Sequence, residues 1–308
     1  MQRNHKFLSF FLLLILIAAA LETTLFLEVS KFTHPPRSDS GIDPKTLLLS
    51  SNDVVFDSNG ARLHGWHIIG KPNYPVLIVA HNYGSNRTEI LAKLEGLVTT
   101  LNKRGYSIFL FDFRGHGDSN GNSALGYREK DDVLAALKTV LKYRTIAPRV
   151  AVFGIGMGAI AATEAASAAD EVKFLILDSI YQDIPTRCTD GILTDWTMMK
   201  FARPFLIQMV EWNLKHGMKI PDTKLNLVKQ MPQLYPKAVL FVEKNPLSPD
   251  SKALYDATKE PKELIQLGET AEGDLIGDAR ATYNKNVEMK IEKYFPPMNG
   301  EQTIELPK

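Results

Sequence analysis

Short β-branched runs alternate with helical patterns over most of this 308-residue chain, and this alternation limits its possible folds more than any other feature. Such alternation is typical of the α/β class, in which helices cover both faces of a mostly parallel sheet. The helices show apolar residues three and four positions apart, as in Val133, Leu137 and Val140. Strands are expected at 76–80, 108–111, 150–153, 174–177, 239–242 and 264–267.

The rhythm breaks between residues 181 and about 236. This stretch is helical in pattern and rich in aromatic residues and methionine, which favours an insertion over a further strand and helix pair. We expect it to form a cap over the carboxyl edge of the sheet. Its large apolar residues are Trp196, Met198, Met199, Phe201, Phe205, Trp212 and Met218.

The N-terminus carries a targeting segment. Basic residues at Arg3 and Lys6 precede an apolar run over 7–21, and counting through to Leu27 gives 21 residues, enough to span a bilayer. We predict a signal anchor, and a cleaved signal peptide with small residues at 18–20 is the alternative. The basic flank lies before the run, so the rest of the chain is expected outside the cytoplasm, as a single-pass membrane protein or, after cleavage, as a secreted one.

The domain organisation follows from these features. We expect a signal anchor or signal peptide over 1–30, an irregular linker over 31–50, one domain over 51–297 that includes the insertion, and a tail over 298–308. Lys and Arg number 36 against 35 Asp and Glu, so the charge of +1 does not indicate nucleic-acid binding. A single cysteine excludes an internal disulfide and a cysteine-based metal site, and we expect neither metal nor cofactor.

Polar residues and glycines gather directly after the expected strands. Ligand sites in parallel sheets lie beyond the carboxyl ends of the strands, so these segments are the place to look for chemistry. The charged residues of one of them, Asp112, Arg114 and Asp118, are expected to hold their own loop together. The segments are 81–86, 111–119, 154–158 and 243–249.

On these segments the chain resembles the α/β-hydrolase family, in particular its membrane-anchored bacterial branch of serine aminopeptidase- and lipase-like proteins. The resemblance implies an α/β-hydrolase fold with a helical cap, and hydrolysis by serine, acid and histidine in that chain order. It rests on Leu-His-Gly-Trp at 63–66, His-Asn-Tyr-Gly at 81–84 where the family usually has H-G-x-G, 112–119, 126–128, 177–179 and the terminal helix.

The resemblance places other residues at the three catalytic positions. Gly156 stands at the nucleophile position of the G-x-S-x-G turn, Asn245 at the acid position, and Ala271 or Glu272 at the base position. An amide in place of the acid costs about 10⁴ in rate in the well-studied serine proteases. No histidine follows His216 in the chain.

Part of the catalytic scaffold is expected to survive these changes. The backbone of Asn82 or Tyr83 and that of Met157 would form the oxyanion hole. We therefore predict a catalytically inactive, membrane-tethered protein that binds a small-molecule or protein ligand which the sequence does not identify. The alternative is an active hydrolase of esters, amides or acyl groups.

An active enzyme would need relocated catalytic groups. The candidates are His81, His116, Glu243 and Glu272, which stand at strand ends or close after them. Cys188 is a further candidate nucleophile, although we expect it to be a small structural residue.

Two other patterns suggest sites that we consider less favoured. Gly154, Gly156 and Ala159, with Asp178 ending the next strand, fit a dinucleotide-binding turn. That fingerprint follows the first strand of a dinucleotide-binding fold, whereas this turn follows a later strand. A dinucleotide-binding fold also does not account for the insertion. His64 and His67 stand three apart on an expected strand, so they face opposite sides and make poor joint metal ligands.

Overall fold

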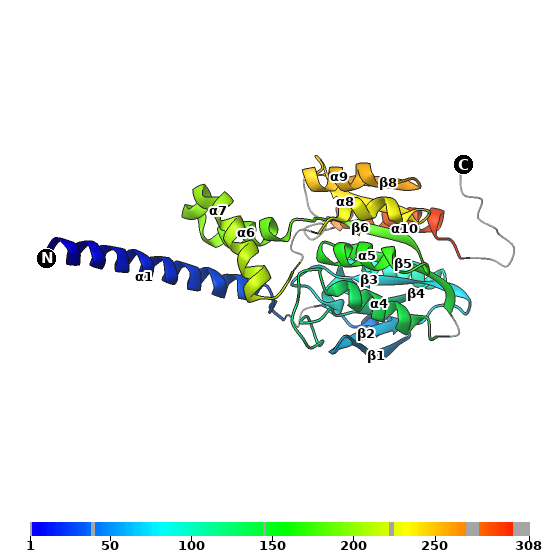
Figure 1. Cartoon of the computed structure of the whole chain (residues 1–308). Helices are drawn as coiled ribbons and strands as arrows, with labels where there is room; N and C mark the ends of the chain where they lie inside the picture. The colour runs from blue at the N-terminus through cyan, green and yellow to red at the C-terminus, as the bar shows by residue number, and fades with distance from the viewer. Residues whose placement is uncertain (1, 38–40, 144–145, 222–224, 269–276, 298–308) are drawn as a thin grey trace. The chain divides into compact units, whose positions relative to one another are not determined.

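The computed structural model describes residues 2–37, 41–143, 146–221, 225–268 and 277–297 (Figure 1). The chain forms two compact units. The helical unit comprises Met1–His34 and Asp183–Leu225, and the sheet unit comprises Pro35–Gln182 and Asn226–Lys308.

An eight-stranded sheet forms the centre of the sheet unit, in the order β1-β2-β4-β3-β5-β6-β7-β8. The β1–β2 and β2–β4 pairs are antiparallel, and all other neighbours are parallel. The six strands predicted from apolar runs are confirmed, and the hairpin β1–β2 is added at one edge. The bounds are β1 Ser51–Ser58, β2 Ala61–Ile68, β3 Tyr74–Ala80, β4 Ser107–Phe111, β5 Ile146–Ile155, β6 Val172–Asp178, β7 Ala238–Lys244 and β8 Lys262–Leu267.

Helices cover both faces of the sheet, as the alternating pattern predicts. One face carries α2, α3 and α10, whose apolar residues share a core with alternate residues of the strands. The other face carries α4 and α5, which lie side by side in Figure 1, followed by α8 and α9. The bounds are α2 Arg87–Lys93, α3 Glu95–Lys103, α4 Glu129–Val140, α5 Met157–Ser167, α8 Leu227–Gln230, α9 Pro249–Ala257 and α10 Gly277–Tyr294.

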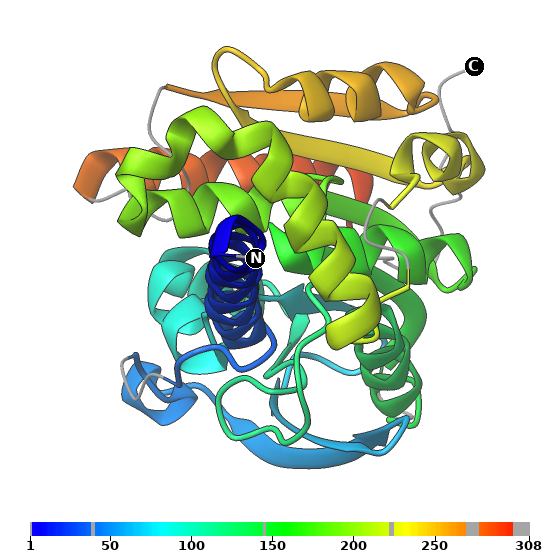
Figure 2. The ribbon, with the colours of Figure 1, turned by 60° about the vertical axis from the view of Figure 1, so that its left-hand side comes forward.

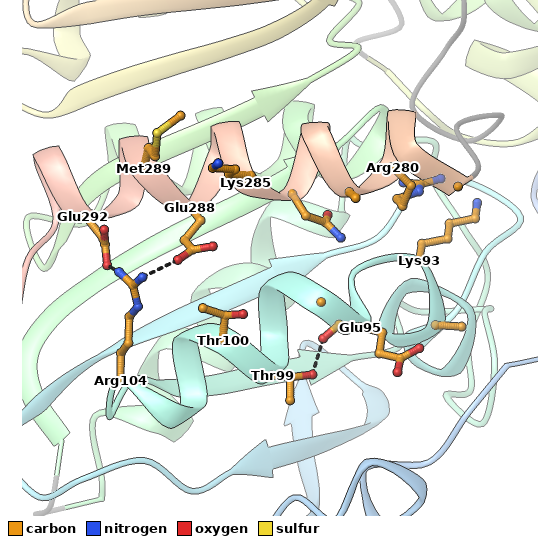
Figure 3. A pocket seen from close by; sticks show the side chains of 15 residues that line it. Lys93, Glu95, Thr99, Thr100, Arg104, Arg280, Lys285, Glu288, Met289 and Glu292 are labelled. Atoms are coloured by element: carbon orange, nitrogen blue, oxygen red, sulfur yellow. Dashed lines mark hydrogen bonds and ion pairs between the residues drawn. The ribbon is translucent and has the colours of Figure 1, made fainter.

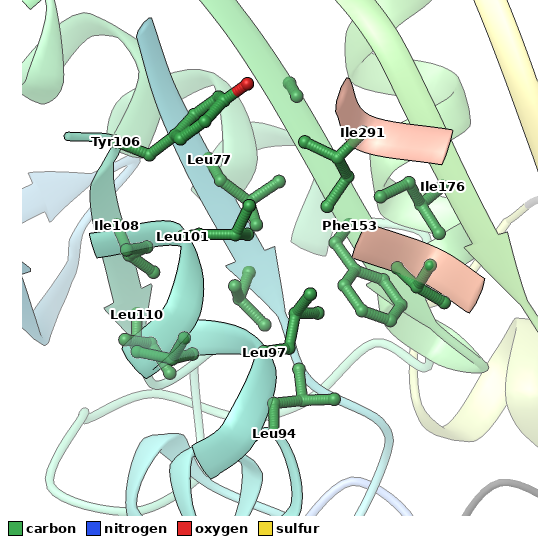
Figure 4. Close-up of a cluster of buried hydrophobic side chains, with 14 of the residues drawn as sticks. Leu77, Leu94, Leu97, Leu101, Tyr106, Ile108, Leu110, Phe153, Ile176 and Ile291 are labelled. Atoms are coloured by element: carbon green, nitrogen blue, oxygen red, sulfur yellow. The ribbon is translucent and has the colours of Figure 1, made fainter. Parts of the chain in front are cut away.

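The core on the α3 and α10 face shows how the period-two pattern of the strands is used (Figure 4). Leu77 of β3 and Ile108 of β4 point to this face and meet Leu97 and Leu101 of α3. Ile291 of α10 closes the cluster. Each buried aliphatic side chain of this size stabilises the fold by about 1.5–3 kcal/mol, so this layer contributes strongly to the stability of the sheet unit.

The segment before β1 is more ordered than an irregular linker. A short 3₁₀ turn, η1 Pro44–Leu47, is capped by the side chain of Asp43. Ile42 and Leu47 pack against the core, and Leu49 is buried. The second half of the expected linker therefore belongs to the sheet unit.

The helical unit is built around α1 Gln2–Lys31. Its stretch Phe7–Lys31 contains a window of 18 residues with a mean hydropathy of 2.5 and is long and apolar enough to cross a membrane. Leu25 and Val29 are buried, and the side chain of Glu22 accepts a hydrogen bond from Asn213 at 2.9 Å. Figure 2 views α1 nearly end-on.

The insertion contributes the rest of the helical unit, with α6 Ile184–Asp195, the 3₁₀ turn η2 Thr197–Ala202, α7 Arg203–Trp212 and the π-turn η3 Asn213–Gly217. Its helical character is as predicted. The unit ends at Leu225, earlier than the predicted end near 236. The following turns, α8 and η4 Met231–Leu234, pack against α5 in the sheet unit, because Leu227, Met231 and Leu234 are buried there.

Candidate functional site

Two neighbouring strand ends create the candidate site. In the parallel pair β3 and β5, Ala80 stands opposite Gly154. The segments that follow, 81–84 and 155–157, therefore leave the sheet side by side at its carboxyl edge, where α/β proteins bind ligands.

The turn after β5 places a glycine in an unusual backbone conformation directly before α5. Gly156 has φ 54° and ψ −111°, a conformation that side chains adopt only under strain. Its N–H donates to the carbonyl oxygen of Asp178 at 2.8 Å, and α5 begins at the next residue. A Cβ at Gly158 would lie 2.1 Å from the carbonyl oxygen of Ala80, so close packing of α5 on β3 requires that glycine.

Two backbone N–H groups converge on one oxygen beside this turn. Tyr83 and Met157 donate to the side-chain oxygen Oδ1 of Asn82 at 2.8 and 3.1 Å. Two converging N–H donors are the arrangement by which hydrolases stabilise an oxyanion. The predicted backbone groups of Tyr83 and Met157 thus come together, whereas Asn82 supplies an acceptor that fills the space between them.

The Asn82 carboxamide also occupies the space into which a side chain at residue 156 would extend. A Cβ built on Gly156 would lie 2.2 Å from Asn82 Oδ1 and 2.6 Å from its Cγ. No real side chain tolerates such distances, so a residue larger than glycine at 156 would displace the amide. Asn82 and Gly156 both depart from the family pattern. The Asn82 amide fits at its position because residue 156 has no side chain.

His81 is fixed by hydrogen bonds at both ring nitrogens. Its Nε2 accepts from the N–H of Phe113 at 3.0 Å, so Nδ1 carries the proton and donates to the carbonyl oxygen of Asn82 at 2.7 Å. Complete burial lowers the pKa of His81 to about 4. The ring is neutral at physiological pH and holds the loop after β3 against the loop after β4.

His116 lies next to His81 and is also neutral. Its Nδ1 donates to the carbonyl oxygen of Arg114 at 3.0 Å, and its ring meets the Tyr83 ring edge to face at 5.7 Å. Burial lowers the pKa of His116 to about 3. Its Nε2 is buried without a hydrogen-bond partner among the described residues. The geometry shows a packed ring with one unused acceptor.

Glu243 stands at the end of β7 and is 5% exposed. Its Oε1 accepts the N–H of Ile180 at 3.0 Å. Burial raises the pKa of Glu243 to about 7, although the hydrogen bonds from Ser251 and Ile180 oppose this shift. A carboxyl group with such a pKa gains or loses its proton near neutral pH.

The raised pKa of Glu243 predicts a pH-dependent stability. Between pH 4.5, the ordinary pKa, and about 7, the native state holds more protons than the unfolded state, so the free energy of unfolding falls as the pH rises. The loss above pH 7 is about 3 kcal/mol. Glu243→Gln keeps the acceptor for Ile180 and removes this loss. We expect it to stabilise the protein at pH 8 much more than at pH 5 in urea unfolding.

A surface control accompanies this measurement. Glu95→Gln changes an exposed glutamate on α3 and should leave the difference in unfolding free energy between pH 5 and pH 8 as in the parent protein. Equal effects of Glu243→Gln at both pH values would show that Glu243 does not titrate in this range.

Of the remaining predicted catalytic positions, only Asn245 lies among the described residues. Asn245 is exposed in the loop after β7, and its N–H donates to the carbonyl oxygen of Leu267 at 3.1 Å. Ala271 and Glu272 lie outside the described residues. The base position and the relocated base Glu272 therefore stay predictions.

The loop after β4 is tied together by its charged residues, as predicted. Asp112 is fully buried and accepts the N–H groups of Arg87 at 2.7 Å and Asp118 at 3.0 Å. The Arg87 guanidinium pairs with both carboxylates. Arg114 pairs with Asp132 at 2.6 Å, and both side chains are almost completely buried. These ions shape the loop beside the site and do not enter it.

The sequence interpretation missed Arg87, Asp132 and Glu129. Glu129 is buried and accepts the N–H groups of Ala124 and Gly126, both at 2.8 Å, and so fixes the loop before α4. The sequence feature that could have indicated Glu129 and Asp132 is their place in the first turn of a helix that begins directly after a glycine-containing loop.

The structure assigns local roles to the less favoured candidates. Asp178, which a dinucleotide ribose would need, is fully buried and bonded to the hydroxyl groups of Tyr283 and Ser179. Cys188 is buried, which raises its pKa to about 12 and disfavours the nucleophilic thiolate. His67 is buried and stacks on Tyr143 at 4.4 Å.

A separate groove of about 640 Å³ lies between α3 and α10 (Figure 3). Charged side chains line it, and Arg104 bridges its walls by pairing with Glu288 at 2.7 Å and with Glu292. None of the lining residues belongs to the turn at Gly156 or to the loop after β3. Among the described residues, no group of three or more His, Cys, Asp or Glu side chains could hold a metal ion.

Comparison with known proteins agrees with this architecture. The model of the serine aminopeptidase (S33) family matches residues 72–265, which is more than half of the chain. The chain belongs to this family. The S33 match covers the strands from β3 to β7 and the whole insertion, so the turn at Gly156 lies inside the matched region.

The relatives of this S33 member include two uncharacterized bacterial proteins. YfhR of Escherichia coli K12 is 27% identical over 191 residues, which covers 59% of this chain and 64% of YfhR. The chain thus spans less than two thirds of that relative. YqkD of Bacillus subtilis is 26% identical over 258 residues, 76% of this chain and 77% of YqkD.

Among solved structures, the esterase Pf2001 of Pyrococcus furiosus has the same fold. It superposes with a TM-score of 0.69 at 19% identity, covering 85% of this chain and 98% of the esterase. This likeness shows an α/β-hydrolase fold, as the sequence predicted.

Proposed function

We propose that this protein is a catalytically inactive member of the S33 family, tethered to the membrane by α1, which uses the hydrolase scaffold to bind a small-molecule or protein ligand. The observation that carries the proposal is the contact between Asn82 and Gly156. A serine side chain at 156 and the Asn82 amide could not occupy their positions together.

The filled N–H pair supports loss of catalysis independently of the missing serine. An oxyanion hole acts only when its donors point at the space where charge develops. Here Tyr83 and Met157 donate to Asn82 Oδ1 instead. A substrate carbonyl would have to displace the Asn82 amide and would then find no nucleophile at Gly156.

The groups proposed for relocated catalysis are engaged elsewhere. Both ring nitrogens of His81 are bonded, and burial lowers the pKa of His81 and of His116 far below neutrality. A general base needs a pKa near the working pH and reach to the proton it removes. Among the candidates that the structure describes, Glu243 alone meets the first condition, so it is the described residue on which an active hydrolase, the alternative function, would depend.

Membrane tethering is proposed on the length and hydropathy of α1. The basic residues before the apolar run favour an orientation with the sheet unit outside the cytoplasm. If the segment is cleaved as a signal peptide, the same orientation would make the protein secreted.

A screen of short-chain esters with the full-length protein in detergent tests the proposal. We expect no hydrolysis above that of a heat-denatured sample, because the scaffold lacks a nucleophile. Turnover that disappears on a single substitution, His81→Ala, His116→Ala or Glu243→Gln, would establish the alternative function. Asp57→Asn, an exposed change on β1, is the matched control.

A further inference from the structure

The insertion carries a row of large apolar side chains on its surface. Met198, Phe201, Phe205 and Trp212 are 89%, 84%, 63% and 54% exposed. Single exposed apolar residues are common, but a contiguous group of this kind marks an interaction site. We refer to these four residues as the apolar stripe.

The apolar stripe follows one side of the continuous segment η2–α7. Its members stand 3, 7 and 14 positions after Met198. Met198 and Phe201 are one 3₁₀ turn apart in η2, and Phe205 and Trp212 are seven positions apart in α7, which at about 100° per residue places those two within roughly 20° of each other. Leu206 and Val210 are buried on a different side of α7. The segment therefore has two apolar sides, of which one packs inside the helical unit and the other stays exposed.

One end of the apolar stripe, at Trp212, lies close to the part of α1 that could cross a membrane. Asn213, the neighbour of Trp212, donates to Glu22, the first charged residue after the apolar run over 7–21. Helix α1 also contacts α7 and η3 directly. Trp212 therefore lies at the level where the apolar run ends, the position at which tryptophan is enriched in membrane proteins.

The charges near the apolar stripe suit a lipid surface. Between residues 198 and 212 the chain carries two cations, Lys200 and Arg203, and one carboxylate, Glu211, which pairs with Lys215 at 2.7 Å. Long basic side chains can extend from an apolar helix face toward lipid phosphates. Arg203 also pairs with Asp190 of α6 at 2.8 Å, which fixes its position within the unit.

We propose that the apolar stripe is inserted into the lipid bilayer beside α1, so that η2–α7 forms an interfacial membrane helix. The partner of this surface is the acyl and headgroup region of one leaflet. The proposal rests on the proposed membrane anchoring by α1. It assigns the insertion a second point of membrane contact, which would hold the helical unit in a defined orientation on the bilayer.

Site-directed fluorescence in proteoliposomes tests the proposal on the full chain. The buried thiol is removed by Cys188→Ala, and an environment-sensitive nitrobenzoxadiazole probe is attached after Phe201→Cys or Phe205→Cys. Leu16→Cys reports on α1, and Lys103→Cys reports on an exposed position of the sheet unit. The vesicles contain phosphatidylcholine and phosphatidylglycerol, with nitroxide-labelled lipid or aqueous iodide as the quencher.

The expected result is several-fold stronger quenching by nitroxide lipid at 201 and 205 than at 103, with weak quenching by iodide. Strong iodide quenching at 201 and 205 together with lipid quenching at 16 would overturn the lipid contact and leave the anchoring intact. Protection from both quenchers at 201 and 205 would also overturn it, because protein would then cover the stripe. Iodide access at 16 with lipid quenching at 201 would support the contact and contradict the anchoring.

Discussion

Gly156→Ser is expected to remain unreactive toward esters and fluorophosphonates. A serine hydroxyl is a weak nucleophile unless an adjacent base accepts its proton. Asn245 cannot stabilise an imidazolium, and no histidine follows His216. The new side chain would also collide with the Asn82 amide. Displacing this amide breaks the two hydrogen bonds that it accepts from Tyr83 and Met157. The rate of ester hydrolysis and the intact mass after treatment with the probe are the measurements.

A stepwise series extends this prediction. Asn82→Gly with Gly156→Ser frees the N–H pair for a substrate, and we expect slow labelling, since an oxyanion hole without a complete triad gives about 10³–10⁴ over water. Adding Asn245→Asp and a histidine by Ala271→His or Glu272→His should raise kcat/KM further, because an amide at the acid position costs about 10⁴. Asn82→Gly alone is the control and should stay inactive.

Efficient turnover by Gly156→Ser without the other changes would contradict this account. It would show that an acid and a base already stand within reach of residue 156, and that the acid position at Asn245 and the base position at 271 or 272 are wrong.

Asp132→Ala is expected to lower the free energy of unfolding by about 3–5 kcal/mol, the usual cost of leaving one partner of a buried ion pair alone. Arg114 is only 6% exposed at its side chain, and Asp132 is fully buried. The Arg114 guanidinium would keep a hydrogen bond to Ser58 at 3.2 Å but no opposite charge at that distance. Urea unfolding in detergent measures the effect.

Two further variants distinguish the stability loss caused by breaking the ion pair from that caused by any substitution in α4. Asp131→Ala removes the neighbouring carboxylate, which accepts a surface hydrogen bond from Asn59, and should cost less than about 1 kcal/mol. Arg114→Met with Asp132→Leu replaces both ions and should be less destabilising than Asp132→Ala. Equal losses for Asp131→Ala and Asp132→Ala would show that burial of the pair does not decide stability.

Most of the sheet could be predicted because its parallel strands are buried on both faces. Six of the seven residues of β3 are buried, which leaves a continuous apolar run in the sequence. The strand β1 alternates buried and exposed residues and contains Asn52, Asp53 and Asp57, so its signal is weak. The insertion was recognised by its composition, but its end at Leu225 depends on which turns pack against α5.

The sequence predicted where the candidate site lies, but it did not predict which side-chain contacts are made there. Gly156 and the unusual Asn82 are each visible against the family pattern, and the sequence placed the N–H donors near 83 and 157. Asn82 and Met157 stand 75 positions apart, and nothing local to either residue indicates that the Asn82 side chain reaches the turn. That contact arises from the parallel pairing of β3 and β5, which brings the two loops together.

The central claim is that this S33 scaffold has lost its nucleophile. The most direct test is intact-mass spectrometry of the full-length protein after exposure to a fluorophosphonate probe, with an active serine hydrolase treated in parallel. We predict that the mass of the protein stays unchanged while the active hydrolase gains one adduct. A stoichiometric adduct, mapped by peptide sequencing to a single residue of this chain, would contradict the claim and identify the nucleophile.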